Sequence, residues 1–198
     1  MKGSLLLALS SFAASPEFAP FIWQQLESSQ ILPTLPKQRG APATPQDGFC
    51  PFQLIYSFIS GIIFFFFAEG IKYELEHVEA KAETYPECKG FLILLQRLLE
   101  SSGIPENLGS GYRVPGFQPF LHFSIDSCFL RLSSRAYSDP KEKEEISTIC
   151  LKIFYQLLLL LDVGQGVVSQ TEQNLIHRHP GFEVLLRILC GTRLLPSV

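Results

Sequence analysis

Apolar residues recur at every third or fourth position over most of the chain, which is the spacing of amphipathic α-helices. The first such run, residues 5–14, predicts a core helix. A second helix is expected to begin at residues 15–17, where a capping serine, a proline at the first helical position and an acid in the first turn follow one another. Four apolar residues then share one face: Phe18, Phe21, Ile22 and Leu26. We therefore expect an N-terminal helix pair over residues 1–39.

Two further helices are predicted on either side of Pro86. Four residues form the apolar stripe of the first: Ile71, Leu75, Val78 and Ala82. Its charged residues lie mostly off that stripe: Glu74, Glu76, Glu79, Lys81 and Glu83. The second helix is more thoroughly apolar, runs through residues 91–99 and ends at Gly103, a residue suited to a left-handed C-terminal cap. Two helices with one short break between them can form a hairpin.

The remaining predicted helices follow a connector rich in glycine and proline, residues 104–116. The next helix carries apolar residues at helical spacing: Phe117, Leu121, Ile125, Cys128, Phe129 and Leu132. The clearest helix start comes at residues 139–142, with an N-cap aspartate, a proline at the first position and a capping-box glutamate. The core face of this helix is Ile146, Ile149, Cys150, Ile153, Phe154, Leu157, Leu158 and Leu161. A last helix is predicted over residues 180–190.

No stretch alternates with period two for long enough to predict a strand, so the expected fold class is all-α, with about seven helices. Short connections favour an α-solenoid segment over residues 69–198, and an irregular bundle is the alternative. An internal repeat supports the solenoid, because Arg-Val-Pro-Gly-Phe at residues 113–117 and Arg-His-Pro-Gly-Phe at residues 178–182 each open a helix, 65 residues apart.

Two segments imitate membrane signals. Residues 48–68 carry no charge and have the hydropathy of a transmembrane span, while Met1, Lys2 and the apolar run after them imitate a signal peptide. The two signals contradict each other, because Lys37 and Arg39 favour a cytoplasmic side for the N-terminal end of the span, which a cleaved signal peptide would place in the lumen. A small single-span membrane protein with a cytosolic helical domain remains the alternative interpretation.

Charge and cysteine content exclude several functional classes. The chain of 198 residues has 16 Lys and Arg against 19 Asp and Glu, so its net charge of −3 provides no basic surface for direct nucleic-acid binding. Its five cysteines lie 22 to 40 residues apart and form no CxxC pair, so neither a zinc cluster nor a complete disulfide framework fits. A reduced, intracellular chain is the simpler interpretation. The 17 phenylalanines, beside one Met and one Trp, are an unusual excess.

No constellation of residues predicts a catalytic, metal or cofactor site. The histidines lack a carboxylate or cysteine at metal-ligand spacing: His77, His122, His177 and His179. The glycine pairs of residues 109–111 and 164–166 follow no strand, so we interpret them as turns. Cys128 and Cys150 fall on apolar stripes, where a buried thiol has a raised pKa and little reactivity. The acidic cluster Glu142, Glu144 and Glu145 complements a helix dipole.

Four stretches resemble the large α-helical scaffold nucleoporins of the nuclear pore inner ring, and most of all the largest inner-ring member. They are SPEFAPFIWQQLESSQIL (15–32), GIKYELEHVEAKAETYP (70–86), NLGSGYRVPGFQPFLHFSIDSCFLRLSSRAY (107–137) and HPGFEVLLRIL (179–189). The most specific parts are NLG-x-G, PGF-x-P-x-L and FLR-x-x-x-RAY, which occur here in family order.

The resemblance implies a segment of a longer solenoid at the nuclear envelope, which scaffolds the pore and supports nucleocytoplasmic transport of protein and mRNA. Its implied partners are other inner-ring nucleoporins and short motifs of disordered linker nucleoporins. It implies no catalysis, cofactor, small-molecule substrate, direct nucleic-acid contact or genuine membrane span.

The sequence departs from the family in two places. Glu144 stands where the family tends to carry a tryptophan, so a hydrophobic anchor at that helix start is expected to be missing. Residues 40–68 have no counterpart in the family, whose flanking segments nearly join. Our hypothesis is that this apolar insert is translated intron, since its phenylalanine tract at residues 64–67 is what a pyrimidine-rich splice acceptor would encode.

Overall fold

The computed structural model describes residues 2–29, 31–32, 70–105, 108 and 116–162. Within these ranges all regular structure is helical and no strand occurs, so the all-α prediction is confirmed. The elements are α1 (Lys2–Ala13), α2 (Ala19–Ser28), α4 (Ile71–Tyr73), the π-helix η1 (Glu74–Glu79), α5 (Ala80–Ala82), α6 (Pro86–Ser102), α7 (Gln118–His122), the π-helix η2 (Phe123–Cys128), the 3₁₀ turn η3 (Phe129–Arg131) and α8 (Pro140–Asp162). The helix predicted over residues 180–190 and the apolar insert of residues 40–68 lie outside the described residues.

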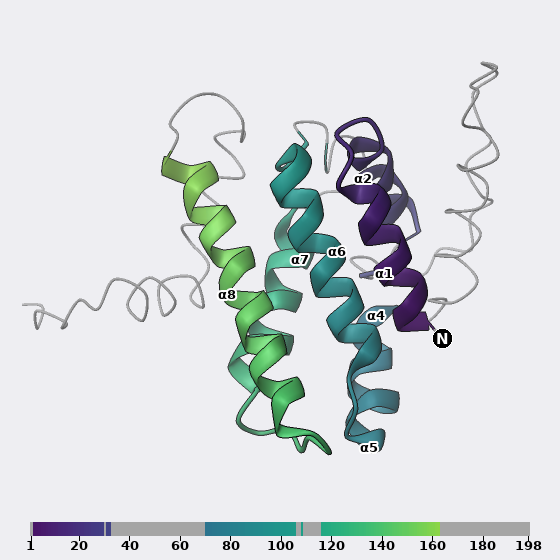
Figure 1. Cartoon of the computed structure of the whole chain (residues 1–198), viewed down its shortest axis with the longest axis vertical. Coiled ribbons are helices and arrows are strands. Elements are labelled where there is room, and N and C mark those ends of the chain that lie inside the picture. Colours follow the sequence, from purple (N-terminus) through teal and green to yellow (C-terminus); the bar gives the residue numbers. More distant parts are fainter. Residues whose placement is uncertain (1, 30, 33–69, 106–107, 109–115, 163–198) are drawn as a thin grey trace, which may run out of the picture.

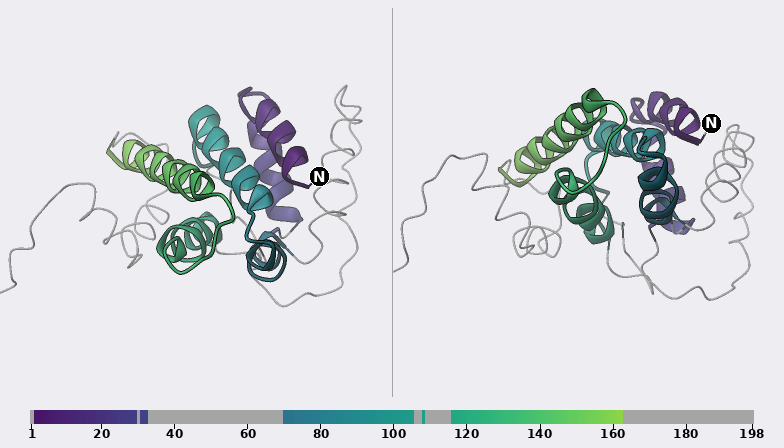
Figure 2. Two further views of the ribbon diagram at one scale, coloured as in Figure 1. Left: turned by 60° about the horizontal axis from the view of Figure 1, so that its bottom comes forward. Right: turned by 90° about the horizontal axis from the view of Figure 1, so that it is seen from below.

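These elements form six rods, because α4, η1 and α5 are continuous, as are α7, η2 and η3. We call these two composite rods rod 71–82 and rod 118–131. The rods stack in two layers (Figures 1 and 2). One layer holds α1, α6 and α8, with α6 between the other two, and the second holds α2 and the two composite rods. Rod 71–82 packs on α6 as the predicted hairpin, and α8 packs on rod 118–131.

The core lies between the two layers. Its largest fully buried side chains include Trp23, Tyr85, Phe91, Phe117, Phe123 and Phe154. The indole Nε1 of Trp23 donates a hydrogen bond to the Gly103 carbonyl at 3.1 Å, and its ring meets Phe120 edge-on at 5.3 Å. Most of the core face predicted for residues 146–158 is buried, and Leu158 is partly buried. The side chain of Leu161 lies outside the described residues.

One of the predicted helix starts is confirmed by the structure and another is wrong. At the start of α8, the Asp139 Oδ1 accepts a hydrogen bond from the Lys141 N–H at 2.9 Å, so the predicted N-cap is confirmed. The start predicted at Ser15 is wrong, because α2 begins at Ala19 and residues 15–18 form a turn. In that turn the Ser15 carbonyl, and not its hydroxyl, accepts hydrogen bonds from the N–H groups of Phe18 and Ala19.

The buried stripe of rod 71–82 also differs from the prediction. Ile71 and Leu75 are buried as expected, but Val78 is 47% exposed and Ala82 is also exposed, while Glu79 is only 2% exposed. The cause is the π-helix at Glu74–Glu79. Hydrogen bonds from residue i to i+5 place more residues in each turn, so the inward face moves one position along the chain.

α1 and α6 cross with their backbones in contact, and glycines make this possible. A Cβ atom added to Gly3 would lie 2.5 Å from the Pro86 carbonyl oxygen, and one added to Gly90 would lie 2.8 Å from the Gly3 carbonyl oxygen. Real Cβ atoms do not approach backbone atoms so closely. Any larger residue at either position therefore has to push the two helices apart.

The two ends of the segment that contains the insert meet. The Ile71 N–H donates a hydrogen bond to the Ile31 carbonyl at 2.9 Å, and both side chains are fully buried. Gly70, with φ 86°, directs the chain into this contact. Residues 31 and 71, on either side of the insert, thus lie together in the core.

Candidate interaction surface

The residues that carry the RAY part of the resemblance hold two turns together. The Tyr85 hydroxyl donates a hydrogen bond to the Ala136 carbonyl at 2.8 Å, and the Arg135 guanidinium lies 6.0 Å from the centre of the Tyr85 ring. The Tyr137 ring lies 4.7 Å from that of Tyr85, and burial raises the pKa of Tyr137 to about 12. The Ser138 N–H completes the clamp by donating to the Glu83 carbonyl at 2.9 Å. These motif residues join two helix pairs.

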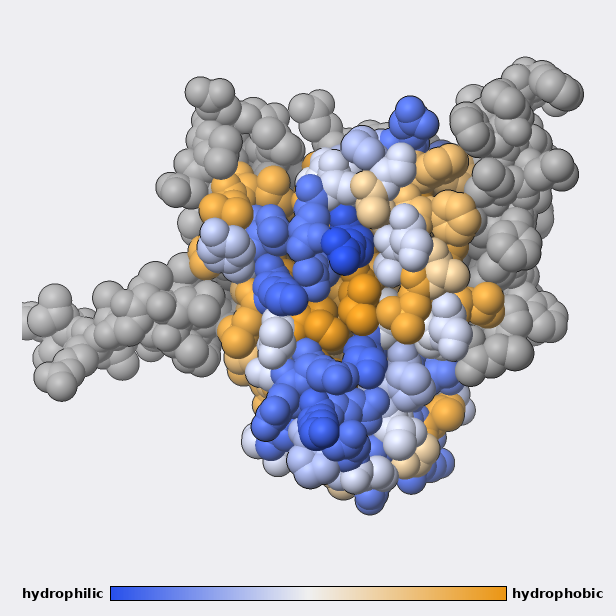
Figure 3. Space-filling model, viewed as in Figure 1, coloured by the Kyte–Doolittle hydropathy of each residue, from blue (hydrophilic) through white to orange (hydrophobic). Residues whose placement is uncertain are grey.

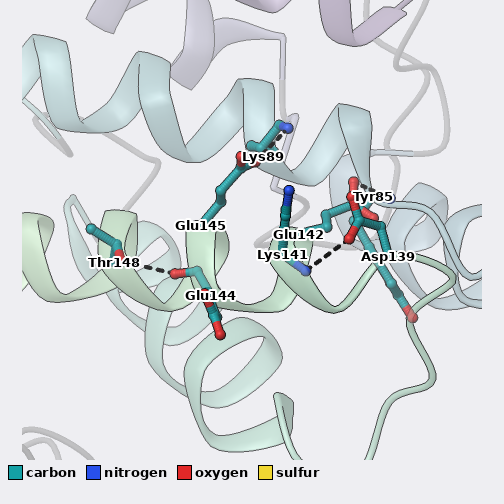
Figure 4. A network of polar contacts seen from close by, with 8 residues as sticks. All are labelled: Tyr85, Lys89, Asp139, Lys141, Glu142, Glu144, Glu145 and Thr148. Atoms are coloured by element: carbon teal, nitrogen blue, oxygen red, sulfur yellow. Dashed lines mark hydrogen bonds and ion pairs between the residues drawn. The ribbon is translucent and has the colours of Figure 1, made fainter.

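The acidic cluster of α8 belongs to the same junction (Figure 4). Glu142 accepts a hydrogen bond from the Tyr85 N–H at 3.0 Å. Its carboxylate therefore binds the turn before α6, whereas the sequence predicts that it forms a capping box at the start of its own helix. Glu145 pairs with Lys89 of α6 at 2.9 Å. Glu144 is exposed, so the position where the resemblance leads us to expect a tryptophan faces solvent. Two of the three acids therefore make contacts that the sequence did not suggest.

Among the acidic residues that the structure describes, Glu79 has the most strongly shifted pKa. Its carboxyl oxygens accept hydrogen bonds from the N–H groups of Glu87 and Cys88, at 2.6 Å and 3.1 Å, and so cap the N-terminus of α6 from another helix. Burial, and after it a side-chain hydrogen bond with Glu87, raise the pKa of Glu79 to about 9, although the hydrogen bonds from the backbone act to lower it. α-Helical spacing does not predict the burial of Glu79, because it places this residue off the buried stripe.

Three cysteines of the described ranges lie in the core: Cys88, Cys128 and Cys150. The hydrogen bond with Cys128 and then burial raise the pKa of Cys88 well above its usual value. Burial likewise raises the pKa of Cys128 and of Cys150. The prediction that Cys128 and Cys150 are packing residues with raised pKa is confirmed.

The other candidates for chemistry are scattered. The His77 ring lies 4.6 Å from Tyr73 on rod 71–82, while the His122 Nδ1 lies 2.7 Å from the Asp126 Oδ2 on rod 118–131. Within the described part of the chain, no three His, Cys, Asp or Glu residues are grouped to hold a metal ion. His177, His179 and the glycine pairs at 109–111 and 164–166 lie outside the described residues.

Of the seven large apolar side chains that are exposed among the described residues, three lie on the composite rods (Tyr73, Val78 and Leu130) and four lie on the two edge helices of the first layer. On α1 these are Leu7 (40% exposed) and Phe12 (44%), and on α8 they are Tyr155 (58%) and Leu159 (40%). Figure 3 shows apolar areas over α1 and the upper part of α8, a further apolar area in the middle of this face, and hydrophilic residues above and below that middle area. We call the first two areas the α1 edge and the α8 edge. Each belongs to a helix whose opposite face is packed on α6.

Comparison of this sequence with known proteins identifies a family. Residues 1–189 match the family described as nuclear pore complex scaffold, nucleoporins 186/192/205. The chain belongs to this family. It is 36% identical over 197 residues to the nuclear pore complex protein Nup205 of Homo sapiens, and 30% identical over 195 residues to that of Drosophila melanogaster.

These alignments cover 96% and 98% of the chain but only 8% of each Nup205. The scaffold nucleoporin resemblance is thus confirmed, and the chain corresponds to a small part of its curated relatives. Among the helices that the structure describes, none is both long enough and apolar enough to cross a membrane. The segment whose hydropathy imitates a span, residues 48–68, is not among the described residues.

Proposed function

We propose that this chain serves as one segment of a nuclear pore scaffold at the nuclear envelope and performs no catalysis. It presents stacked helical surfaces to other inner-ring nucleoporins and so supports pore assembly and transport through the pore. The single observation that carries this proposal is the layer of α1, α6 and α8, in which the central helix is covered on both sides while the α1 edge and the α8 edge expose apolar residues.

The apolar edges have the composition of contact surfaces. A stacked array buries the face of each helix against the next, so the outer helices of any isolated portion keep faces that a neighbour would cover. Aromatic residues contribute most to such contacts, and each edge exposes one, Phe12 or Tyr155. Short motifs of disordered linker nucleoporins are the second proposed class of occupant. No nucleic acid, small-molecule substrate or cofactor is part of the proposal.

The test places the chain in a complete protein. The matching segment of human Nup205 is replaced by this chain, and co-purification of inner-ring nucleoporins is measured with and without the segment. Two double variants, Leu7→Ser with Phe12→Ser and Tyr155→Ser with Leu159→Ser, remove the apolar edges. We expect at least one of them to reduce recovery of a partner several-fold.

Lys141→Ser with Glu144→Ser, on the exposed hydrophilic start of α8, is the matched control and should leave recovery unchanged. Unchanged recovery with both edge variants, in proteins whose thermal unfolding is unaltered, would reject the edges as contact surfaces. Loss of the whole segment without effect on any partner would reject the scaffold role.

We also propose that residues 40–68 are translated intron and not part of the scaffold. The hydrogen bond between Ile71 and Ile31 supports this, because the chain on either side of the segment already meets without it. Alignment of the transcript with the genome is the direct test, and an ordinary exon without splice signals at its edges would remove the idea. Extraction with alkaline carbonate tests the alternative of a membrane span, since a spanning chain stays in the pellet.

A further inference from the structure

Two buried thiols are in direct contact at the centre of the stack. The Sγ atoms of Cys88 and Cys128 lie 3.5 Å apart, and both residues are almost completely buried. Cys88 is in the first turn of α6, and Cys128 is the last residue of the π-helix η2 in rod 118–131. The pair therefore joins the central helix of one layer to a rod of the other.

We infer that Cys88 and Cys128 form an oxidation-dependent disulfide that links α6 to rod 118–131. A disulfide requires the sulfurs to approach to about 2.05 Å, so the two atoms have to move together by roughly 1.5 Å. The backbone at Cys128 can supply part of this movement. Its φ and ψ of −100° and −72° depart from helical values, because the π-helix gives way to a 3₁₀ turn at this residue.

The third buried cysteine is placed differently. The Cys150 Sγ lies 3.9 Å from the Ser124 carbonyl oxygen, a weak hydrogen-bond acceptor for its thiol. Cys88 and Cys128 instead form a hydrogen bond with each other, in which either thiol can donate. The pairing is thus specific to two of the three core cysteines, and Cys150 provides a matched control in the same core.

The chemistry needs a two-electron oxidant, for which a peroxide is sufficient. One thiol loses its proton and attacks a peroxide oxygen, which yields a sulfenic acid and one water molecule. The second thiol then attacks that sulfur, so the S–S bond forms and a second water molecule leaves. In sum, two thiols and one hydrogen peroxide give one disulfide and two waters.

The surroundings make this reaction slow in the folded protein. Thiolates are the reactive form, and the raised pKa of both thiols keeps them protonated at neutral pH. Two ionisable groups act on the pair in opposite directions, since Arg135 favours the thiolates, while Glu79 disfavours them once it loses its proton, near pH 9. We therefore expect oxidation over hours, at a rate set by local opening of the core, and not the rapid response of an exposed sensor.

The consequence is a more rigid core. The bond closes a loop of 40 residues that contains the connector after α6, and loops of this length typically raise the melting temperature of a protein of this size by about 10 °C. The α1 edge and the α8 edge carry none of the atoms involved. Oxidation would fix the arrangement of the two layers and leave both edges chemically unchanged.

The experiment maps the bond in the full 198-residue chain. Folded protein is treated with hydrogen peroxide at pH 8, free thiols are blocked with N-ethylmaleimide, and tryptic peptides are analysed without reduction. The expected product links peptide 82–89, AETYPECK, to peptide 114–131, VPGFQPFLHFSIDSCFLR. It should be reversed by dithiothreitol, and the oxidised protein should melt about 10 °C higher.

Cys150→Ala should leave this link in place, whereas Cys88→Ala and Cys128→Ala should each abolish it. The disulfide map of the unsubstituted protein tests the inference even if a variant fails to fold. A dominant link that involves peptide 144–152, Cys50 or Cys190 would overturn the inference. Recovery of both Cys88 and Cys128 as alkylated thiols, after prolonged oxidation and unfolding in the alkylating agent, would do the same.

Discussion

The crossing of α1 and α6 predicts that Gly90→Ala destabilises the fold, although alanine is the better helix former. The added Cβ would lie 2.8 Å from the Gly3 carbonyl oxygen and 3.1 Å from the Leu6 Cβ. The first of these contacts is with backbone, which cannot rotate away as a side chain can. The whole of α1 therefore has to shift outward by several tenths of an ångström.

The magnitude follows from two opposing effects. Forcing an extra methyl group into a packed contact costs about 1–3 kcal/mol, while replacing glycine by alanine inside a helix returns about 1 kcal/mol. The net expectation is a loss of up to about 2 kcal/mol. The loss grows if α1 detaches, because Leu6 and Leu9 are fully buried beneath it and each contributes about 1.5–3 kcal/mol.

The assay is urea unfolding of the 198-residue chain, followed by the fluorescence of its one tryptophan, Trp23, which is buried in the core. Gly90→Ala should lower the midpoint, and Gly3→Ala, whose Cβ would lie 2.5 Å from the Pro86 carbonyl oxygen, should lower it further. Ser4→Ala, at the neighbouring exposed position of α1, is the matched control and should change it little. A midpoint raised by Gly90→Ala, as helix propensity alone requires, would refute the backbone contact.

Three further predictions follow from contacts described above. Removal of residues 40–68 should raise soluble yield and sharpen thermal unfolding, and equal or poorer behaviour would show that they belong to the fold. Tyr85→Phe should cost about 0.5–1.5 kcal/mol in urea unfolding, because the part-buried hydrogen bond from the Tyr85 hydroxyl to the Ala136 carbonyl is lost, whereas Tyr73→Phe, at an exposed tyrosine, should cost almost nothing. The pKa of Glu79 is about 9 in the folded chain against an ordinary 4.5, so the folded state keeps a proton that the unfolded state releases between these values, and stability should fall as pH rises through that window. Glu79→Gln should remove that dependence in unfolding measured from pH 5 to 9, and an unchanged pH profile would show that the buried carboxyl is not its source.

Much of the fold could be predicted from the sequence because most of the helices obey local rules. The Asp139 cap, the break at Pro86 and the apolar stripe of residues 146–158 each depend on near neighbours along the chain, and all three agree with the structure. The start of α2 was placed too early, since a turn and a first helical residue share the same Ser-Pro signal. The resemblance to scaffold nucleoporins was likewise carried by short stretches of sequence, and the family match confirms it.

The candidate surface was much less predictable. Which apolar residues remain exposed depends on which helices lie at the edge of a layer, and that follows from the stacking order, with α6 between α1 and α8. Tyr155 and Leu159 lie within the same apolar run as the buried Leu157, and composition does not separate them. A glycine inside the helical run at residue 90 was the one available signal for the close crossing, because an interior glycine often marks a close approach of backbone.

The sequence by itself determined the helical class, the positions of most helices, the burial of Cys128 and Cys150 and the membership of a scaffold family. Tertiary structure alone decided that Glu79 caps a helix other than its own, that Cys88 meets Cys128, and that two glycines let α1 and α6 touch. The physical reason is the separation along the sequence over which each interaction acts. Hydrophobic periodicity and helix caps act within a few residues, whereas these contacts join residues 8 to 87 positions apart. Glu79 and Cys128 also lie in π-helical segments, which α-helical spacing does not anticipate.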